Sequence, residues 1–179
     1  MSVNVTPLYI KSSFPTKVMS LMNKEILNKI SIILKKQLLK IATAESCTGG
    51  LISHTLTNIS GSSDYFDRGI ISYSNKAKIE LLGVTEDLLE KYGAVSEQVA
   101  KAMATGVRIQ SNVDIGIATT GIAGPTGGTK DKPVGLVYIA VSTDDTTIVK
   151  KFQFSGDRLE NKENTCDAAL QMLLDIITE

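Results

Sequence analysis

The sequence predicts an α/β protein, a three-layer α/β/α sandwich built around a mixed, mostly parallel sheet. Amphipathic helical patterns alternate with short strand-like runs, which is typical of helices that cover both faces of a sheet. The last two strand-like runs are separated only by a short acidic turn, so at least one strand should run antiparallel to the others. The chain has 179 residues, 42% of them hydrophobic, which is enough for one domain with a proper core.

The helices are predicted from apolar residues at helical spacing and from capping residues. A strongly amphipathic pattern runs from Leu21 to Leu38 and forms the first helix. Thr85 and Ser96 are suitable N-caps for two helices in the middle of the chain. The predicted helices are residues 21–38, 49–57, 75–82, 86–91, 97–110 and 159–177.

The strands are predicted from continuous or alternating apolar runs that are rich in β-branched residues. The predicted strands are residues 41–44, 69–74, 115–120, 135–142 and 147–154. Asp144 and Asp145 form the tight turn that should join the last two strands as a hairpin.

Residues 1–20 are polar and contain two prolines, so we expect a flexible N-terminal tail. Residues 21–179 are expected to form the single domain. Tyr9, Ile10 and Phe14 offer an alternative, in which the tail docks on the domain or on a partner.

Charge and cysteine content restrict the classes of partner. Lysine plus arginine and aspartate plus glutamate both number 19, so no overall basic field favours nucleic acid or an anionic membrane. Cys47 and Cys166 stand far apart without metal-ligand spacing, so we expect neither a disulfide nor a metal site. The sequence shows no membrane-spanning run and no signal peptide, which predicts a cytoplasmic protein.

The first candidate loop is residues 43–50, where a buried strand runs into small polar residues and two glycines before a helix. Backbone N–H groups of such a turn bind anions, and they also stabilise the oxyanion of an acyl-transfer reaction. The alternative is that Ser46 or Thr48 only caps the helix.

The second candidate loop is residues 119–130, which also follows a predicted buried strand. Its four glycines allow the backbone to approach a ligand phosphate closely. It is not a Walker A loop, because the order of Thr129, Lys130 and Asp131 does not give the glycine-lysine-serine/threonine ending. A flexible surface loop is the alternative interpretation.

The catalytic base is more plausibly a lysine than a histidine. His54 is the single histidine and lies two helical turns beyond Ser46, about 12 Å along the helix, which argues against a serine-histidine-aspartate triad. A desolvated lysine can activate a serine instead. Lys76 and Lys78 project about 200° apart, so only one can face the site, and Lys78 has the more apolar setting. Solvated surface lysines are the alternative.

Eight stretches of the chain resemble, in the same order, motifs of the CinA C-terminal family, which is the nicotinamide-nucleotide amidase family. The resemblance runs from about Leu27 to the C-terminus. The stretches are 43–50 (TAESCTGG), 61–63 (GSS), 72–78 (SYSNKAK), 82–84 (LGV), 92–96 (YGAVS), 120–128 (TGIAGPTGG), 132–135 (KPVG) and 154–158 (FSGDR).

The resemblance implies hydrolysis of nicotinamide mononucleotide to nicotinate mononucleotide and ammonia, without a metal or an organic cofactor. It implies that Ser46 is the nucleophile, that Lys78 is the general base and that Tyr73 relays or orients the proton. It also implies that the protein is a homodimer. The residues that it implies for substrate binding are Thr48, Gly49, Gly50, Thr120, Gly121, Gly124 and Arg158.

Arg158 is implied as the partner of the 5'-phosphate, a role that suits a planar fork of donors. Many relatives have a second arginine where this chain has Lys162, which predicts a weaker or different grip on the phosphate. Many also carry an N-terminal molybdopterin-binding-like domain, and its pyrophosphatase activity is not expected of this chain.

Three alternatives to this function remain open. The first is a catalytically silent nucleotide-binding module in a competence or DNA-damage setting. The second is an amidohydrolase that acts on another amide. The third keeps the activity but makes Cys47 the nucleophile, acidified by the helix N-terminus.

Overall fold

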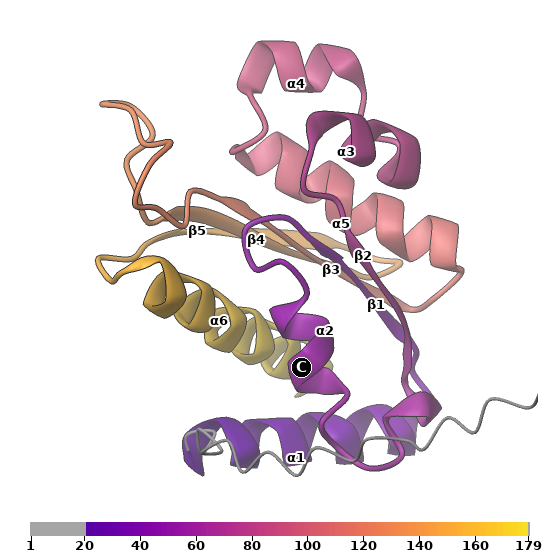
Figure 1. Ribbon diagram of the computed structural model, residues 1–179. Coiled ribbons are helices and arrows are strands. Elements are labelled where there is room, and N and C mark those ends of the chain that lie inside the picture. Colours follow the sequence, from indigo (N-terminus) through magenta and orange to yellow (C-terminus); the bar gives the residue numbers. More distant parts are fainter. Residues whose placement is uncertain (1–20, 179) are drawn as a thin grey trace, which may run out of the picture.

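The structure is a computed structural model that describes residues 21–178, so the expectation for residues 1–20 lies outside them. A five-stranded sheet lies between two layers of helices (Figure 1). The strands are β1 (Ile41–Glu45), β2 (Phe66–Ile71), β3 (Ile115–Gly121), β4 (Leu136–Ser142) and β5 (Thr147–Gln153). The helices are α1 (Leu21–Gln37), α2 (Leu51–Leu56), α3 (Asn75–Leu82), α4 (Glu86–Tyr92), α5 (Glu97–Ser111) and α6 (Arg158–Thr178).

The sheet has the strand order β2-β1-β3-β4-β5. β1 pairs in parallel with both β2 and β3, whereas β4 runs antiparallel to β3 and β5. Four strands therefore point one way and β4 points the other, which confirms the predicted mixed sheet and the predicted hairpin. The hairpin turn is closed by the N–H of Thr143, which donates to the carbonyl of Thr146 at 2.8 Å.

Each face of the sheet buries its own hydrophobic cluster. α1, α2 and α6 cover one face of the sheet (Figure 1). Large strand side chains, such as Ile41, Ile117 and Ile139, are buried on that face. α3, α4 and α5 lie over the other face, which the same strands line with alanines such as Ala42 and Ala118. The two faces thus differ in side-chain size, as alternation along each strand allows.

Small residues bring α5 close to the sheet. A Cβ on Gly116 in β3 would lie 2.1 Å from the carbonyl oxygen of Ala104 in α5, so no larger residue fits there without movement of the helix. A Cβ on Gly106 would lie 2.0 Å from the carbonyl oxygen of Leu82, which brings α3 equally close to α5. Because α3 packs on α5, it also has a defined place relative to β1 and β3.

Two elements differ from their predicted ranges by more than one residue at an end, and β2 also ends at Ile71 instead of Ser74. α2 begins at Leu51 instead of Gly49, because Gly49 and Gly50 have φ angles of 62° and 96°, which are incompatible with a right-handed helix. β2 begins at Phe66 instead of Gly69, since backbone pairing with β1 extends to residues whose side chains show little apolar pattern. The carboxyl ends of β1, β2 and β3 nevertheless meet at one edge, and both candidate loops leave the sheet there.

Candidate active site

Ser46 follows β1 directly at the carboxyl edge of the sheet. Its N–H donates to the carbonyl oxygen of Thr119 in β3 at 3.0 Å, which extends the β1–β3 pairing by one residue. The residue is 9% exposed, so its hydroxyl group is nearly enclosed while it still borders a cavity. A rigid strand end thereby places one candidate nucleophile.

Lys78 faces Ser46 from α3. Its Nζ lies 3.1 Å from Ser46 Oγ and donates to the carbonyl oxygen of Ser72 at 2.8 Å. Only 1% of Lys78 is exposed, and this burial lowers the pKa of its ammonium group below the ordinary value for lysine. Lys76, the other candidate, is exposed, and its Nζ lies 3.6 Å from Glu80 Oε1. Of the two lysines left open by the sequence, the structure therefore brings Lys78 to the serine.

Capping interactions explain how α3 presents this lysine. Ser74 is the N-cap, and its hydroxyl accepts from the N–H of Ala77 at 3.0 Å. The helix ends at Gly83, whose φ of 68° closes it after two turns. Lys78 thus occupies the second turn of a short helix that is capped at both ends, which limits its freedom to leave the site.

Glu45 is a site residue that the sequence analysis missed. Its carboxylate is fully buried and accepts hydrogen bonds from the N–H groups of Gly50, Ile52 and Ser53 at 2.8–3.1 Å. The Ser53 hydroxyl donates to it as well, at 2.6 Å. Glu45 therefore caps α2 from the end of β1. The one available signal was its place between a buried strand and a helix start, since a buried carboxylate needs several donors.

The expectation that Ser46 or Thr48 caps α2 is wrong. Glu45 takes that role, and the hydroxyl of Thr48 forms a 2.9 Å hydrogen bond with the hydroxyl of Thr119 instead. The hydroxyl of Ser46 accepts a hydrogen bond from Lys78 instead. The reason is geometric, because the two left-handed glycines separate these side chains from the first helical turn.

A cavity of about 320 Å³ opens beside Ser46 and Lys78, large enough for a small ligand. Residues that follow β1 converge on it with residues of β3, α3 and the second glycine-rich loop. Thr48, Gly49 and Gly50, which the resemblance implies as substrate contacts, do not line it. The lining residues are Ser46, Cys47, Tyr73, Asn75, Lys78, Ala94, Val95, Thr120, Gly121, Ile122, Ala123, Gly124, Thr126, Gly127 and Arg158.

Three residues of the second loop, Thr120, Gly121 and Gly124, are implied as substrate contacts, and the side chain of Thr120 is already hydrogen-bonded. Its hydroxyl donates to the carbonyl oxygen of Ala94 at 2.7 Å, which links β3 to the α4–α5 connection. Gly121 is tightly packed, because a Cβ there would lie 2.6 Å from a methyl group of Val137. Gly124 has a φ of 89°, so the loop turns through a conformation that favours glycine.

Tyr73 and Arg158 lie together at the mouth of the cavity. Arg158 donates from Nη1 to the carbonyl oxygen of Gly124 at 2.8 Å and from Nη2 to the hydroxyl of Tyr73 at 3.0 Å. Tyr73 is 62% exposed. Its hydroxyl group therefore accepts from a guanidinium, and it forms no hydrogen bond with Ser46 or Lys78. This arrangement fits an orienting role better than the implied proton relay.

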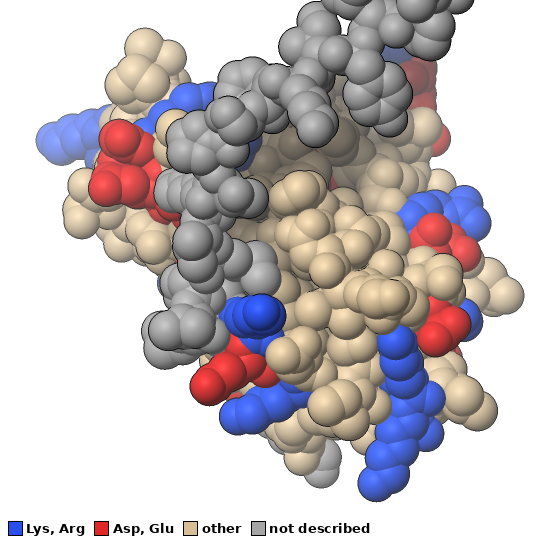
Figure 2. Space-filling model, turned by 60° about the horizontal axis from the view of Figure 1, so that its bottom comes forward, with Lys and Arg blue, Asp and Glu red and all other residues tan. Residues whose placement is uncertain are grey.

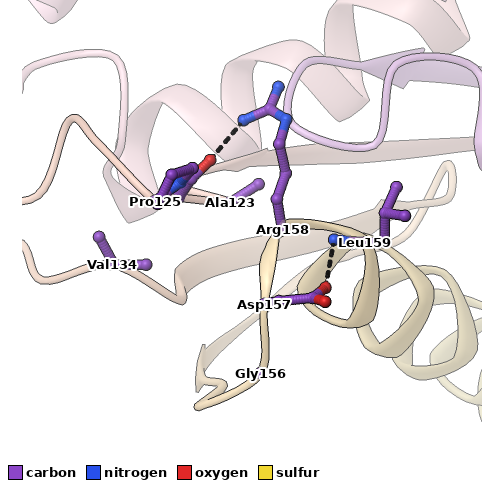
Figure 3. Close-up of a pocket in the computed structure, with 8 residues that line it drawn as sticks. Ala123, Pro125, Val134, Gly156, Asp157, Arg158 and Leu159 are labelled. Atoms are coloured by element: carbon purple, nitrogen blue, oxygen red, sulfur yellow. Dashed lines mark hydrogen bonds between the residues drawn. The ribbon is translucent and has the colours of Figure 1, made fainter.

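A second cavity, of about 460 Å³, adjoins the first across Arg158 (Figure 3). The two cavities share Ala123, Gly124 and Arg158, but the second contains neither Ser46 nor Lys78. Figure 3 shows Arg158 reaching over from the start of α6 to the Gly124 carbonyl. The larger cavity is therefore a neighbour of the candidate catalytic centre, because the paired nucleophile and amine lie only in the smaller one.

Cys47 and His54 do not have the properties of catalytic groups. Burial raises the pKa of the Cys47 thiol to about 11, which argues against the alternative in which the helix N-terminus acidifies Cys47. His54 lies on the exposed surface of α2, as its position in the sequence predicts. Lys162 lies beside the first candidate loop. Its Nζ is 3.7 Å from the position that a Cβ on Gly49 would occupy.

Figure 2 shows no large patch of one charge on the face that it displays, whose centre is mostly uncharged. Lysine, arginine and acidic side chains occur there in small groups of both signs. Within residues 21–178, no helix is long and apolar enough to cross a membrane. Over that same part of the chain, no three His, Cys, Asp or Glu side chains gather so that they could hold a metal ion.

Comparison with known proteins places this site in a family. The model of the CinA C-terminal domain matches residues 23–177. A CinA-like protein of Syntrophus aciditrophicus is 52% identical over 145 residues, which are 80% of this chain and 34% of that protein. The chain thus spans about a third of the length of the curated relatives that it matches.

Solved structures show the same architecture. The competence/damage inducible protein CihA from Agrobacterium tumefaciens has a TM-score of 0.88 and 38% identity, covering 92% of this chain and 100% of that one. A competence or damage-inducible protein from Enterobacter asburiae has a TM-score of 0.84 and 35% identity, covering 87% and 98%. Since the family model matches nearly all described residues and the relatives share both sequence and fold, the chain belongs to the CinA C-terminal domain family.

Proposed function

We propose that this protein hydrolyses the carboxamide of nicotinamide mononucleotide to nicotinate mononucleotide and ammonia. Ser46 is the nucleophile and Lys78 the general base. The observation that carries the proposal is the buried contact of 3.1 Å between Lys78 Nζ and Ser46 Oγ. A lysine with a lowered pKa holds a neutral amine at a lower pH than a solvated lysine, and a neutral amine can accept the proton of the hydroxyl.

The first half-reaction forms an acyl-enzyme. The neutral amine of Lys78 takes the proton of Ser46, and Oγ forms a bond to the carboxamide carbon while the carbonyl electrons move to its oxygen. When the tetrahedral intermediate collapses, the carbon–nitrogen bond breaks and the nitrogen receives the proton from Lys78. Ammonia leaves, and the nicotinoyl group remains as an ester on Ser46.

The second half-reaction restores the enzyme. Lys78 takes a proton from water, and the resulting hydroxide attacks the ester carbon. The bond between that carbon and Oγ breaks, and Ser46 recovers its proton from Lys78. The product is a carboxylic acid, which ionises to nicotinate mononucleotide.

We assign the first oxyanion donor to the N–H of Cys47. The N–H of Gly50 already donates to Glu45 at 2.9 Å, so it is not available for a substrate oxygen. Cys47 immediately follows the nucleophile and borders the cavity, whereas Thr48 and Gly49 do not border it. A backbone donor next to the nucleophile is a recurrent oxyanion contact in serine hydrolases.

Charge in the cavity supports a nucleotide substrate. Its lining contains the guanidinium of Arg158, the amine of Lys78 and no carboxylate. A guanidinium presents a planar fork of donors to a phosphate, and Arg158 stands at the mouth, where a 5'-phosphate would leave the site. The cationic pyridinium ring of the nucleotide also withdraws electrons from its amide, which favours attack over that on neutral nicotinamide.

The decisive experiment follows ammonia release from nicotinamide mononucleotide by the purified protein, compared with calorimetric binding of the same nucleotide. Ser46→Ala should lower kcat by at least about 10³-fold and retain binding, because one oxygen is removed from a preformed loop. Cys47→Ala, the matched neighbour, should stay within about threefold of wild type. Binding without ammonia release by the wild-type protein would identify a silent module instead of an enzyme.

A further inference from the structure

One buried side chain joins the second glycine-rich loop, which borders the catalytic cavity, to the turn before α6, which borders the neighbouring cavity. Asn161 of α6 is 1% exposed, and its Nδ2 donates to the carbonyl oxygens of Ala123 and Gly156 at 3.0 and 2.8 Å. Its Oδ1 accepts from the N–H of Gly156 at 3.0 Å. Both amide hydrogens and the amide oxygen are therefore engaged. These partners also determine the orientation of the amide, because two carbonyls require donors and one N–H requires an acceptor.

Arg158 adds a second contact to the same loop. It lies three residues before Asn161, so the two side chains share one side of the first turn of α6. Arg158 donates to the carbonyl of Gly124, and Asn161 donates to that of Ala123, so two successive loop carbonyls receive donors from α6. Ala123, Gly124 and Arg158 all line the catalytic cavity.

The other interactions at the start of α6 do not provide this link. Asp157 Oδ1 accepts from the N–H groups of Leu159 and Glu160, and Glu160 Oε2 accepts from the N–H of Asp157. This reciprocal capping box orders the helix start upon itself. Asn161 and Arg158 both fasten the ordered turn to the glycine-rich loop, and Asn161 is the fully buried one of the two.

We propose that Asn161 is a positioning residue of the phosphate subsite: it locks the turn before α6 to the Ala123 carbonyl and so keeps Arg158 at the cavity mouth. The inference rests on the proposed function, since it takes a nucleotide phosphate as the anion that Arg158 meets. An aspartate at this position has the same shape but no amide donors, so it leaves two buried carbonyls unpaired.

The test compares Asn161→Asp with Asn164→Asp, which adds the same charge at an exposed position of the same helix. In a Ser46→Ala background, the Kd for nicotinamide mononucleotide should rise about tenfold for Asn161→Asp, equal to about 1.4 kcal/mol, and stay within about twofold for Asn164→Asp. In the active enzyme, KM should rise by a similar factor and kcat should change less than about threefold.

A double-mutant cycle with Arg158→Ala separates positioning from general damage. If Asn161 acts through Arg158, adding Asn161→Asp to Arg158→Ala should weaken binding by no more than about twofold. An unchanged Kd, a fall in kcat at constant KM, or full multiplication of the two effects would overturn the proposal. Asn161→Ser, which adds no charge, replaces the aspartate variant if that variant is isolated unfolded.

Failure of the proposed function is distinguishable in the same experiment. A wild-type protein that binds the nucleotide but releases no ammonia refutes the amidase activity, and the binding cycle still decides the role of Asn161. A wild-type protein that does not bind the nucleotide overturns both proposals.

Discussion

Lys78 can act as a base only while its amine is neutral. Burial disfavours the charged ammonium, so the pKa of Lys78 in the folded protein lies below the ordinary lysine value. Protonated enzyme is inactive in this scheme. The value of kcat/KM should therefore rise as pH increases through the lowered pKa and become constant above it, as measured by ammonia release in a series of buffers.

Replacement by arginine tests the same residue independently of pH. Lys78→Arg should lower kcat by at least about 10²-fold, as much as Lys78→Ala, because a guanidinium remains protonated at any accessible pH. Lys76→Arg is the matched control, since Lys76 is exposed and forms an ion pair with Glu80 on the surface of the same helix. An active Lys78→Arg enzyme with a raised KM alone would make Lys78 a phosphate anchor instead of the base.

The sequence predicted which residues belong to the site better than it predicted the contacts that these residues make. Ser46 and Lys78 were singled out from loop chemistry and from resemblance, and the structure brings them together. Tyr73 was expected beside them but contacts Arg158, 85 residues later in the chain. A hydrogen bond over that separation depends on where the fold places the segment after β2 relative to the start of α6, which no local pattern specifies.

At the level of elements, α2 depends on a carboxylate that precedes it in β1. Glu45→Gln should destabilise the protein by about 2–3 kcal/mol, because an amide cannot accept all the N–H donors that now converge on the carboxylate. It should also lower kcat, since Ser46 is the next residue. Chemical denaturation and ammonia release measure the two effects.

Glu97→Gln is the control for this substitution. Glu97 also stands in the first turn of a helix, α5, but it is exposed. Its loss should cost no more than about 0.5 kcal/mol, the scale of a surface charge near a helix N-terminus. Equal stability of the two variants would show that the buried carboxylate does not hold α2.

At the level of the whole molecule, the parallel strands carry both loops to one edge and the helices on either side complete the cavity. A ligand that binds only this folded arrangement stabilises it by mass action. Nicotinamide mononucleotide at one hundred times its Kd should stabilise the Ser46→Ala protein by about 2.7 kcal/mol, which is about 5–10 °C in Tm. Free nicotinamide at the same concentration, without the ribose phosphate, should shift Tm much less in a thermal melt. Equal shifts would argue against a phosphate subsite.

The sequence by itself determined which segments are helices and strands. Apolar spacing and capping residues specify α3 and α5 almost to the residue, and the short turn between β4 and β5 specifies their antiparallel pairing. These features depend on the local sequence, because the spacing of apolar residues determines which side of a helix or strand is buried. The same local chemistry marked both glycine-rich loops as candidate sites.

Only the tertiary structure decided which side chains meet inside the site. In the folded protein, Lys78 contacts Ser46, whereas Lys76 is exposed to solvent. Glu45 caps α2, and Asn161 binds the glycine-rich loop. Each of these outcomes depends on desolvation and on donors that distant segments supply. The free-energy cost of burying a polar group depends on all of its neighbours in the folded protein. The sequence pattern does not specify which distant residues those neighbours are.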